Sequence, residues 1–285
     1  MRQHAAFALA ALALAGANPA RAGTILFVGN SFTFGACSAV MRYHPERVSD
    51  LNGDGIGGVP ALFKTFADQA GLDWQVSLET SPGKDLAWHL DNKLPLIQRP
   101  WDVVVLQGYS TLDAQRPGDP TRHVAAAKAL AERFHASNPK VSVRLETTWT
   151  RADQTWRKGG HWFGKPVYRM GEDLAAANAL ALKASPLLAG TIPVGGAWNR
   201  AWRTGIADPN PYDGVDFGKA NLWCWDQYHA SAEGSYLAAL TVFGSVTGVD
   251  PRKLGKGERA AQDLGLDPRL AEALRRIAAE ELGFK

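Results

Sequence analysis

The sequence predicts an α/β protein in which a parallel sheet lies between two layers of helices. Short apolar segments alternate along the chain with segments of helical periodicity, which is the pattern of a parallel sheet with covering helices. Some short segments, such as Trp101–Leu106, carry apolar residues on both faces, as strands buried on both sides do. A chain of 285 residues with 46% hydrophobic and 21% charged residues is an ordinary globular composition, which excludes disordered, collagen-like and coiled-coil proteins.

Each element follows from its own pattern. Strands are expected at 24–28, 74–78, 101–106, 141–147 and 190–194, and helices at 59–70, 123–134, 171–184, 231–246 and 268–282. No linker or repeat interrupts residues 23–285, so we expect one domain with long loops at 41–58, 149–166 and 197–228. Seven of the ten tryptophans lie in the last two of these loops, which we therefore expect to be ordered walls of a cleft.

The first 22 residues have the pattern of a secretory signal peptide. Arg2 and His4 precede an apolar run, and Ala20-Arg21-Ala22 resembles a cleavage site. The alternative is a buried N-terminal helix, and the run is too short to span a bilayer. Cleavage near Ala22 removes two arginines and no acidic residue, so the formal charge falls from +3 to +1. The charge therefore favours neither nucleic acid nor an anionic membrane as a partner.

Export of the protein would determine its compartment and the state of its cysteines. No other segment approaches membrane-spanning length, so we expect a secreted or periplasmic protein. Its oligomeric state is left open. An oxidising compartment permits a disulfide between Cys37 and Cys224, with two unpaired thiols as the alternative.

Polar residues gather where strands are predicted to end. Ser31, Gly83 and Gln107 each follow a predicted strand, and the carboxyl ends of parallel strands are where α/β sheets bind ligands. Asp226 precedes His229 by three residues in one loop. A serine hydroxyl needs an imidazole to take its proton, and the imidazole needs an acceptor on its other nitrogen. These residues supply the parts of a serine hydrolase. Ser31 as a helix N-cap and Gly83 as a simple turn residue are the structural alternatives.

Two blocks of the chain resemble the SGNH/GDSL hydrolases. Gly29-Asn30-Ser31-Phe32-Thr33 follows the first strand, and Asp226-x-x-His229 precedes the last long helices, so the resemblance spans nearly all of residues 23–285. It implies a flavodoxin-like three-layer fold, Ser31 as the nucleophile, His229 as its base and Asp226 as the residue that orients the base.

The same resemblance implies an oxyanion hole and no cofactor. In this family the hole combines the N–H of the nucleophile, a glycine N–H and an amide side chain, which implies Ser31, Gly83 and Gln107 here. The chain departs from the family in having Asn30 where GDSL members carry Asp. It also has Leu106-Gln107-Gly108-Tyr109-Ser110 in place of Gly-x-Asn-Asp. Some carbohydrate-esterase branches carry Gln-Gly at that block.

The substrate is expected to be an acetyl ester on a carbohydrate. Tryptophan-rich loops suit stacking against sugars, and Asn30, Tyr109 and Trp149 are the expected substrate contacts. A small-molecule ester is the other form of substrate. A lipase or thioesterase of the same superfamily and a non-catalytic glycan-binding module are the alternative functions.

One loop contains two competing motifs. Asp50, Asn52 and Asp54, followed by Gly55, match the opening of a calcium loop, but its twelfth position is Ala61 rather than Glu. A turn rich in Gly and Asx residues is the alternative. The glycines also match G-x-G-x-x-G, yet no apolar strand precedes them, so dinucleotide binding is not expected. No metal site is otherwise predicted.

Overall fold

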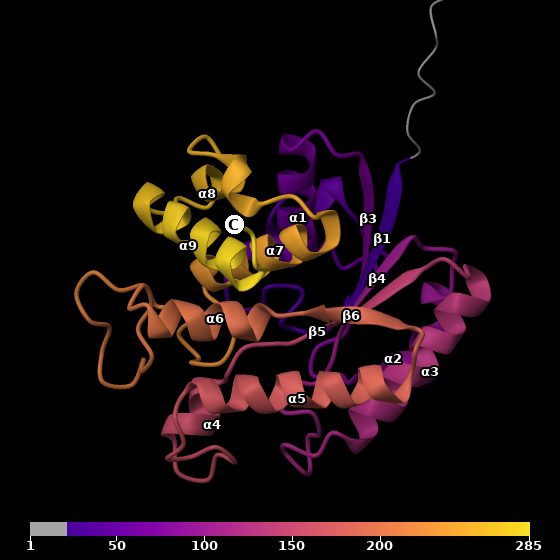
Figure 1. The fold of residues 1–285 in the computed structure, drawn as a ribbon, viewed down its shortest axis with the longest axis horizontal. Helices are drawn as coiled ribbons and strands as arrows, with labels where there is room; N and C mark the ends of the chain where they lie inside the picture. The colour runs from indigo at the N-terminus through magenta and orange to yellow at the C-terminus, as the bar shows by residue number, and fades with distance from the viewer. Residues whose placement is uncertain (1–21) are drawn as a thin grey trace, which may run out of the picture.

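The fold is a six-stranded parallel sheet with helices on both faces (Figure 1). The computed structural model describes residues 22–285, so the predicted signal peptide lies, except for Ala22, outside the described residues. The sheet order is β2-β3-β1-β4-β5-β6, and every strand pair is parallel. In chain order the strands are β1 (Gly23–Gly29), β2 (Ser49–Asp50), β3 (Trp74–Thr80), β4 (Val103–Gln107), β5 (Ser142–Glu146) and β6 (Leu188–Ile192). The predicted fold class is confirmed.

The central strand β1 carries apolar residues at successive positions because both faces of the sheet are covered there. Ile25 and Phe27 belong to the hydrophobic core on one face of the sheet, and Leu26 and Val28 belong to the core on the other. All four side chains are fully buried. Because successive strand residues point to opposite faces, a strand covered on both sides must be apolar throughout.

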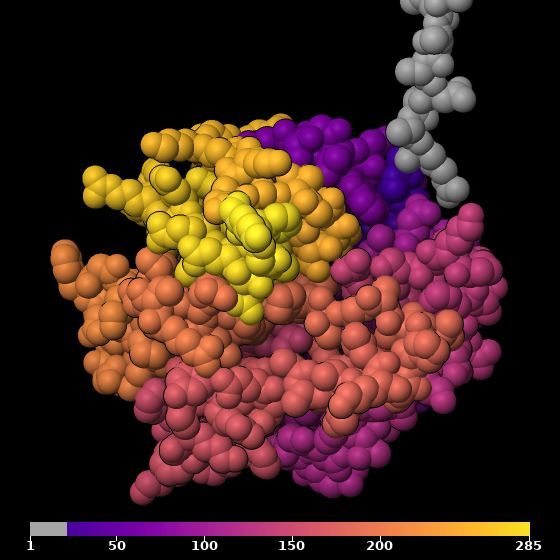
Figure 2. All heavy atoms as spheres, viewed as in Figure 1, coloured from indigo at the N-terminus to yellow at the C-terminus, as the bar shows by residue number. Residues whose placement is uncertain are grey.

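The helices divide between these two cores. One face is covered by α1 (Gly58–Gln69), α6 (Val194–Arg203), α7 (Ala232–Thr247), α8 (Arg259–Asp263) and α9 (Pro268–Glu281). The other is covered by α2 (Leu86–Ile97), α3 (Thr121–Ser137) and α5 (Tyr168–Ala184). Short elements lie in the connections, namely α4 (Ala152–Trp156) and the 3-10 helices η1 (Ala39–Arg42), η2 (Pro45–Arg47) and η3 (Pro251–Leu254). Figure 2 shows the C-terminal segments, in yellow, lying directly against the orange and purple parts of the chain.

The short helices α4 and α8 and the longer helices α2 and α6 were not predicted. Helix α2 contains Pro95, and the first turn of α6 contains Gly195 and Gly196, residues that normally interrupt a helix. A Cβ at position 195 would lie 2.3 Å from the carbonyl oxygen of Thr148. Gly195 therefore allows α6 to pack against the segment that follows β5. The predicted loop at 197–228 begins only after Arg203.

None of the helices within residues 22–285 is long and apolar enough to cross a membrane.

Candidate active site

A cavity of about 280 Å³ opens where several parallel strands end. The loops after β1, β3, β4 and β5 line it, together with the loop that precedes α7. Its walls are Asn30, Ser31, Phe32, Phe34, Ala36, Pro82, Gly83, Tyr109, Ser110, Arg151, Tyr228 and His229. The structure thus brings Ser31, Gly83, Tyr109 and His229 together, although they come from four separate segments.

Asn30 ties the loop that carries Ser31 to its neighbours. Its side-chain amide donates to the carbonyl oxygens of Lys84, at 3.0 Å, and Gly108, at 3.3 Å. Its side-chain oxygen accepts from the N–H of Phe32. Asn30 lines the cavity, but only 2% of it is exposed. All of its polar side-chain atoms bind the protein, so the predicted contact with substrate gives way to a role in positioning Ser31.

Gln107 also holds this loop, and its predicted place in the oxyanion hole is not supported. Its side-chain oxygen accepts from the N–H of Asn30 at 2.9 Å and from the hydroxyl of Thr33 at 3.0 Å. Its side-chain amide donates to the carbonyl oxygen of Gly108. Gln107 is 1% exposed and does not line the cavity. Because Asn30 and Thr33 need an acceptor there, the amide of Gln107 is held inside the protein.

Two backbone N–H groups remain as candidates for binding an oxyanion. The N–H groups of Ser31 and Gly83 make no hydrogen bond to any residue of the described chain, and both residues line the cavity. Gly83 has a φ of +67°, a conformation that residues with a side chain rarely adopt. Glycine at this position therefore permits the turn and leaves its N–H beside the cavity.

Asp226 and His229 form a buried pair in the loop before α7. Nδ1 of His229 lies 2.6 Å from Oδ2 of Asp226. Oδ1 of Asp226 accepts from the backbone N–H groups of Tyr228, at 3.1 Å, and His229, at 3.0 Å. These three contacts fix the ring orientation and leave Nε2 of His229 as the nitrogen open to other chemistry.

For each residue of this pair, burial and the interaction with the partner shift the pKa in opposite directions. Burial would raise the pKa of Asp226, but the hydrogen bonds from His229 and from two backbone N–H groups outweigh it and lower the pKa. Burial lowers the pKa of His229, and the nearby Asp226 only partly opposes this. The resting pair is therefore a carboxylate beside a neutral imidazole, which is the state a general base needs.

Nε2 of His229 is buried and has no hydrogen-bond partner among the described residues. Ser31 lines the same cavity, but no hydrogen bond joins its hydroxyl to His229 in this part of the chain. Such bonds are often long in a free enzyme and shorten when substrate binds. An unpartnered nitrogen beside a cavity serine is the feature of this site that most directly indicates chemistry.

A disulfide connects the two loops that carry these residues. Cys37, six residues after Ser31, is bonded to Cys224, two residues before Asp226, and the two Cα atoms lie 6.2 Å apart. The bond closes a separation of 187 residues. It therefore restrains the Ser31 loop relative to the Asp226–His229 loop.

Trp149 does not line the cavity, so its prediction as a substrate contact is wrong. It is fully buried, and its ring stacks on Phe32 at 4.5 Å and on Trp198 at 4.6 Å. Its indole N–H donates to the carbonyl oxygen of Tyr228 at 3.0 Å. Trp149 lies in the core beneath the site because an apolar ring that also finds a hydrogen-bond partner is best accommodated there.

Arg151 and Tyr228 line the cavity and were not predicted. The Arg151 guanidinium forms a two-pronged ion pair with Asp153, donates to the hydroxyl of Ser110 at 3.3 Å and lies 4.4 Å from the centre of the Tyr228 ring. The Tyr228 ring in turn lies 3.8 Å from the ring of His229. Arg151 follows strand β5, so the strand-end rule that identified Ser31 applies to it as well.

Two of the three side chains of the calcium candidate accept hydrogen bonds from protein groups in the structure. The carboxylate of Asp50 accepts from the N–H groups of Asn52 and Ile56, and the side-chain oxygen of Asn52 accepts from the ammonium of Lys93. Asp54 is exposed. Asp50 is therefore used in turns, and Asn52 is used in a hydrogen bond to Lys93. Within residues 22–285 no group of three or more His, Cys, Asp or Glu residues is arranged to hold a metal.

Comparisons with known proteins support the fold. No protein-family model matches the sequence, and no curated protein matches it. Among solved structures, a DUF4886 family protein from Bacteroides uniformis is similar with a TM-score of 0.62 and 16% identity, over 92% of this chain and 95% of that one. A putative GDSL-like lipase from Parabacteroides merdae is similar with a TM-score of 0.53 and 17% identity, over 79% and 95%. A protein called TesA is similar with a TM-score of 0.50 and 15% identity, over 79% of this chain and 98% of that one. The likeness shows that the chain shares the fold expected from its resemblance to the SGNH hydrolases.

Proposed function

We propose that this protein is a secreted serine esterase that hydrolyses acetyl esters on a carbohydrate. Ser31 attacks the ester carbonyl while Nε2 of His229 takes its proton, and Asp226 stabilises the imidazolium that forms. The N–H groups of Ser31 and Gly83 bind the oxyanion. His229 then protonates the leaving alcohol, and water hydrolyses the acyl-enzyme.

One observation carries the proposal. The Asp226 carboxylate engages Nδ1 of His229 at 2.6 Å, and the buried Nε2 has no partner beside a cavity that Ser31 lines. Within residues 22–285 the buried His89 also has an unpartnered Nε2, but it does not line this cavity, whereas His229 lines it together with Ser31. An unpaired buried polar atom costs about 1–3 kcal/mol. This cost argues for a reacting partner at Nε2.

The choice of a short acyl group rests on the size of the cavity. At about 280 Å³ it is at the small end of ligand sites, and Phe32, Phe34 and Pro82 form its apolar part. Secretion rests on the pattern of the first 22 residues and on the disulfide. A lipase or thioesterase requires room for a long acyl chain, and a glycan-binding module requires no activated serine.

A fluorophosphonate probe tests the nucleophile without knowledge of the substrate. We expect covalent labelling of Ser31, mapped by mass spectrometry, with no label on Ser110 of the same cavity. Ser31→Ala removes the label and lowers esterase kcat by about 10⁴-fold or more. Ser38→Ala, on the same loop but outside the cavity, is the matched control and keeps both. An unlabelled wild-type protein, or a Ser31→Ala variant with normal activity, would refute the proposal.

Substrate length separates the two enzyme alternatives. We expect the wild-type protein to hydrolyse acetyl esters with a higher kcat/KM than octanoyl esters of the same alcohol. The opposite preference would favour a lipase or thioesterase.

A further inference from the structure

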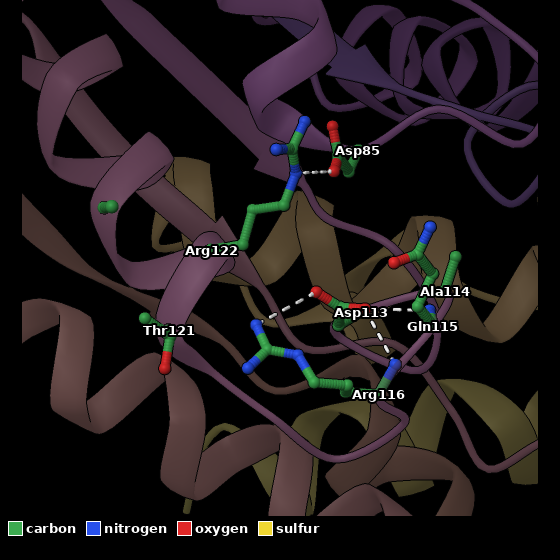
Figure 3. A pocket seen from close by; sticks show the side chains of 8 residues that line it. Asp85, Asp113, Ala114, Gln115, Arg116, Thr121 and Arg122 are labelled. Atoms are coloured by element: carbon green, nitrogen blue, oxygen red, sulfur yellow. Dashed lines mark hydrogen bonds and ion pairs between the residues drawn. The ribbon is translucent and has the colours of Figure 1, made fainter.

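A trench leads out of the active-site cavity toward helices α2 and α3. Its inner part, a cavity of about 190 Å³, shares Gly83 and Tyr109 with the active-site cavity. Its outer part, of about 590 Å³, shares Asp85, Ala114 and Arg122 with the inner part (Figure 3). The three hollows therefore adjoin one another through shared walls, and the trench adds space beyond the cavity that the acetyl group would occupy.

The inner part of the trench offers an aromatic surface among polar groups. Trp88 and Tyr109 both line it, and both are only half-buried. The ammonium of Lys84 lies 5.3 Å from the centre of the Trp88 ring. A flat apolar ring bordered by hydrogen-bond donors matches a pyranose, which has an apolar C–H face and hydroxyls at its edge.

The charges of the outer part are paired. Arg122 forms an ion pair with Asp85, and Arg116 pairs with Asp119 at 2.9 Å (Figure 3 shows the first pair). About half of the Arg122 side chain and two thirds of the Arg116 side chain are exposed, so their remaining N–H groups face solvent. Because a carboxylate balances each guanidinium, this surface supplies planar hydrogen-bond donors without a large net charge. That arrangement suits hydroxyl groups better than a polyanion.

We propose that the trench binds the sugar chain of a neutral oligosaccharide while its acyl ester occupies the active-site cavity. This inference rests on the proposed function and adds to it a polymeric substrate and the place where the polymer lies. Trp88 is the specificity-determining residue, because its ring supplies the stacking surface next to the catalytic cavity. A chain that extends from the cavity across Gly83 and Tyr109 reaches Trp88 first and Arg122 beyond it.

The test compares acetylated neutral oligosaccharides of one to six units with p-nitrophenyl acetate. For the wild-type protein we expect kcat/KM to rise with chain length. Trp88→Ala should reduce the advantage of the hexamer over the monomer by about tenfold. Arg122→Ala, a surface variant with little risk to folding, should reduce it by a smaller factor. Trp156→Ala removes an exposed tryptophan outside the trench and serves as the matched control, with the length dependence unchanged.

A binding measurement separates failure of the trench from failure of the proposed function. Calorimetric titration of Ser31→Ala with the hexamer needs no turnover, and we expect the double variant Ser31→Ala/Trp88→Ala to bind it about tenfold more weakly. If no ester is hydrolysed but this difference is found, the proposed function is wrong and the trench stands. If esters are hydrolysed without dependence on chain length or on Trp88, the trench proposal is wrong. Tighter binding of an oligouronate, with a steep dependence on salt, would overturn the choice of a neutral ligand.

Discussion

The two flanks of the candidate active site differ in composition and burial. On one flank four tryptophans pack beneath the Asp226–His229 loop; this tryptophan flank consists of Trp149, Trp198, Trp202 and Trp223. Trp149 stacks on Trp198 at 4.6 Å, Trp202 stacks on Trp223 at 4.8 Å, and none of the four is more than 7% exposed. The other flank is the trench, which is polar and open and contains the half-buried Trp88.

This difference matches the roles that we propose for the two flanks, which are support of the catalytic loop and recognition of the substrate. The tryptophan flank holds backbone: Trp149 donates to the carbonyl oxygen of Tyr228, and Trp223 donates to that of Thr150 at 2.9 Å. A packed aromatic layer gives little freedom to the catalytic loop above it. On the trench flank the side chains of Arg116 and Arg122 are ion-paired but largely exposed, so their remaining N–H groups face solvent and could bind a polar ligand. Abundance of tryptophan in a loop is therefore a poor guide to which flank binds substrate.

The largest expected effect is on the chemistry that the tryptophan flank supports. Asp226→Asn removes the acceptor that fixes the His229 tautomer, and we expect kcat to fall by about 10³–10⁴-fold. In the proposed mechanism the active base is neutral His229, whose pKa lies below its usual 6.5 because of burial. The value of kcat/KM should therefore fall with acid only below pH 6.5. A midpoint above 6.5, or an Asp226→Asn variant within tenfold of wild type, would contradict this account.

The next effect tests whether the buried tryptophans support the fold. Trp149→Ala leaves a cavity between Phe32 and Trp198, and we expect the free energy of unfolding in urea to fall by about 3–5 kcal/mol. Trp225 is 81% exposed, so Trp225→Ala is the matched control and should change this free energy by about 0.5 kcal/mol or less. Equal losses in the two variants would remove the distinction between buried and exposed tryptophans.

The smallest expected effect is on the pH dependence of stability, and it comes from the buried carboxyl group of Glu146. Glu146 lines a small cavity with Gly108 and Tyr109, and burial raises its pKa to about 8. The folded protein therefore keeps a proton that the unfolded chain loses near pH 4.5, so stability should fall as the pH rises from about 4.5 to 8.

Glu146→Gln removes this dependence. We expect it to raise the free energy of unfolding at pH 7 by on the order of 3 kcal/mol and to flatten its pH profile. Glu132→Gln, at an exposed position of α3, is the control and should leave the profile unchanged. Denaturant unfolding between pH 4.5 and 8 measures both, and a Glu146→Gln profile as steep as that of the wild-type protein would show that another group is responsible.

Local pattern was sufficient for most of the fold. The apolar run at 24–28 lies within β1, because a strand buried on both sides needs continuous apolar sequence, and the alternating segment at 74–78 lies within β3. Helix α6 was not predicted because glycine lowers helix propensity. Gly195 is nevertheless required there, because a side chain would collide with Thr148, a contact that only the folded chain creates. Helix α2 was not predicted; it contains Pro95, a residue that normally interrupts a helix.

The candidate site divides in the same way. By itself the sequence determined that Ser31, Gly83, Tyr109 and the Asp226–His229 loop would stand at one edge of a parallel sheet, since strand ends and residue spacing are local properties. Only the tertiary structure decided what each neighbouring polar or aromatic group does. Gln107 turns inward to hold Asn30, and Trp149 stacks in the core. Arg151 reaches the cavity through contacts with Asp153 and Tyr228. Burial and hydrogen-bond partners are set by residues distant in the chain, so no local pattern contains them.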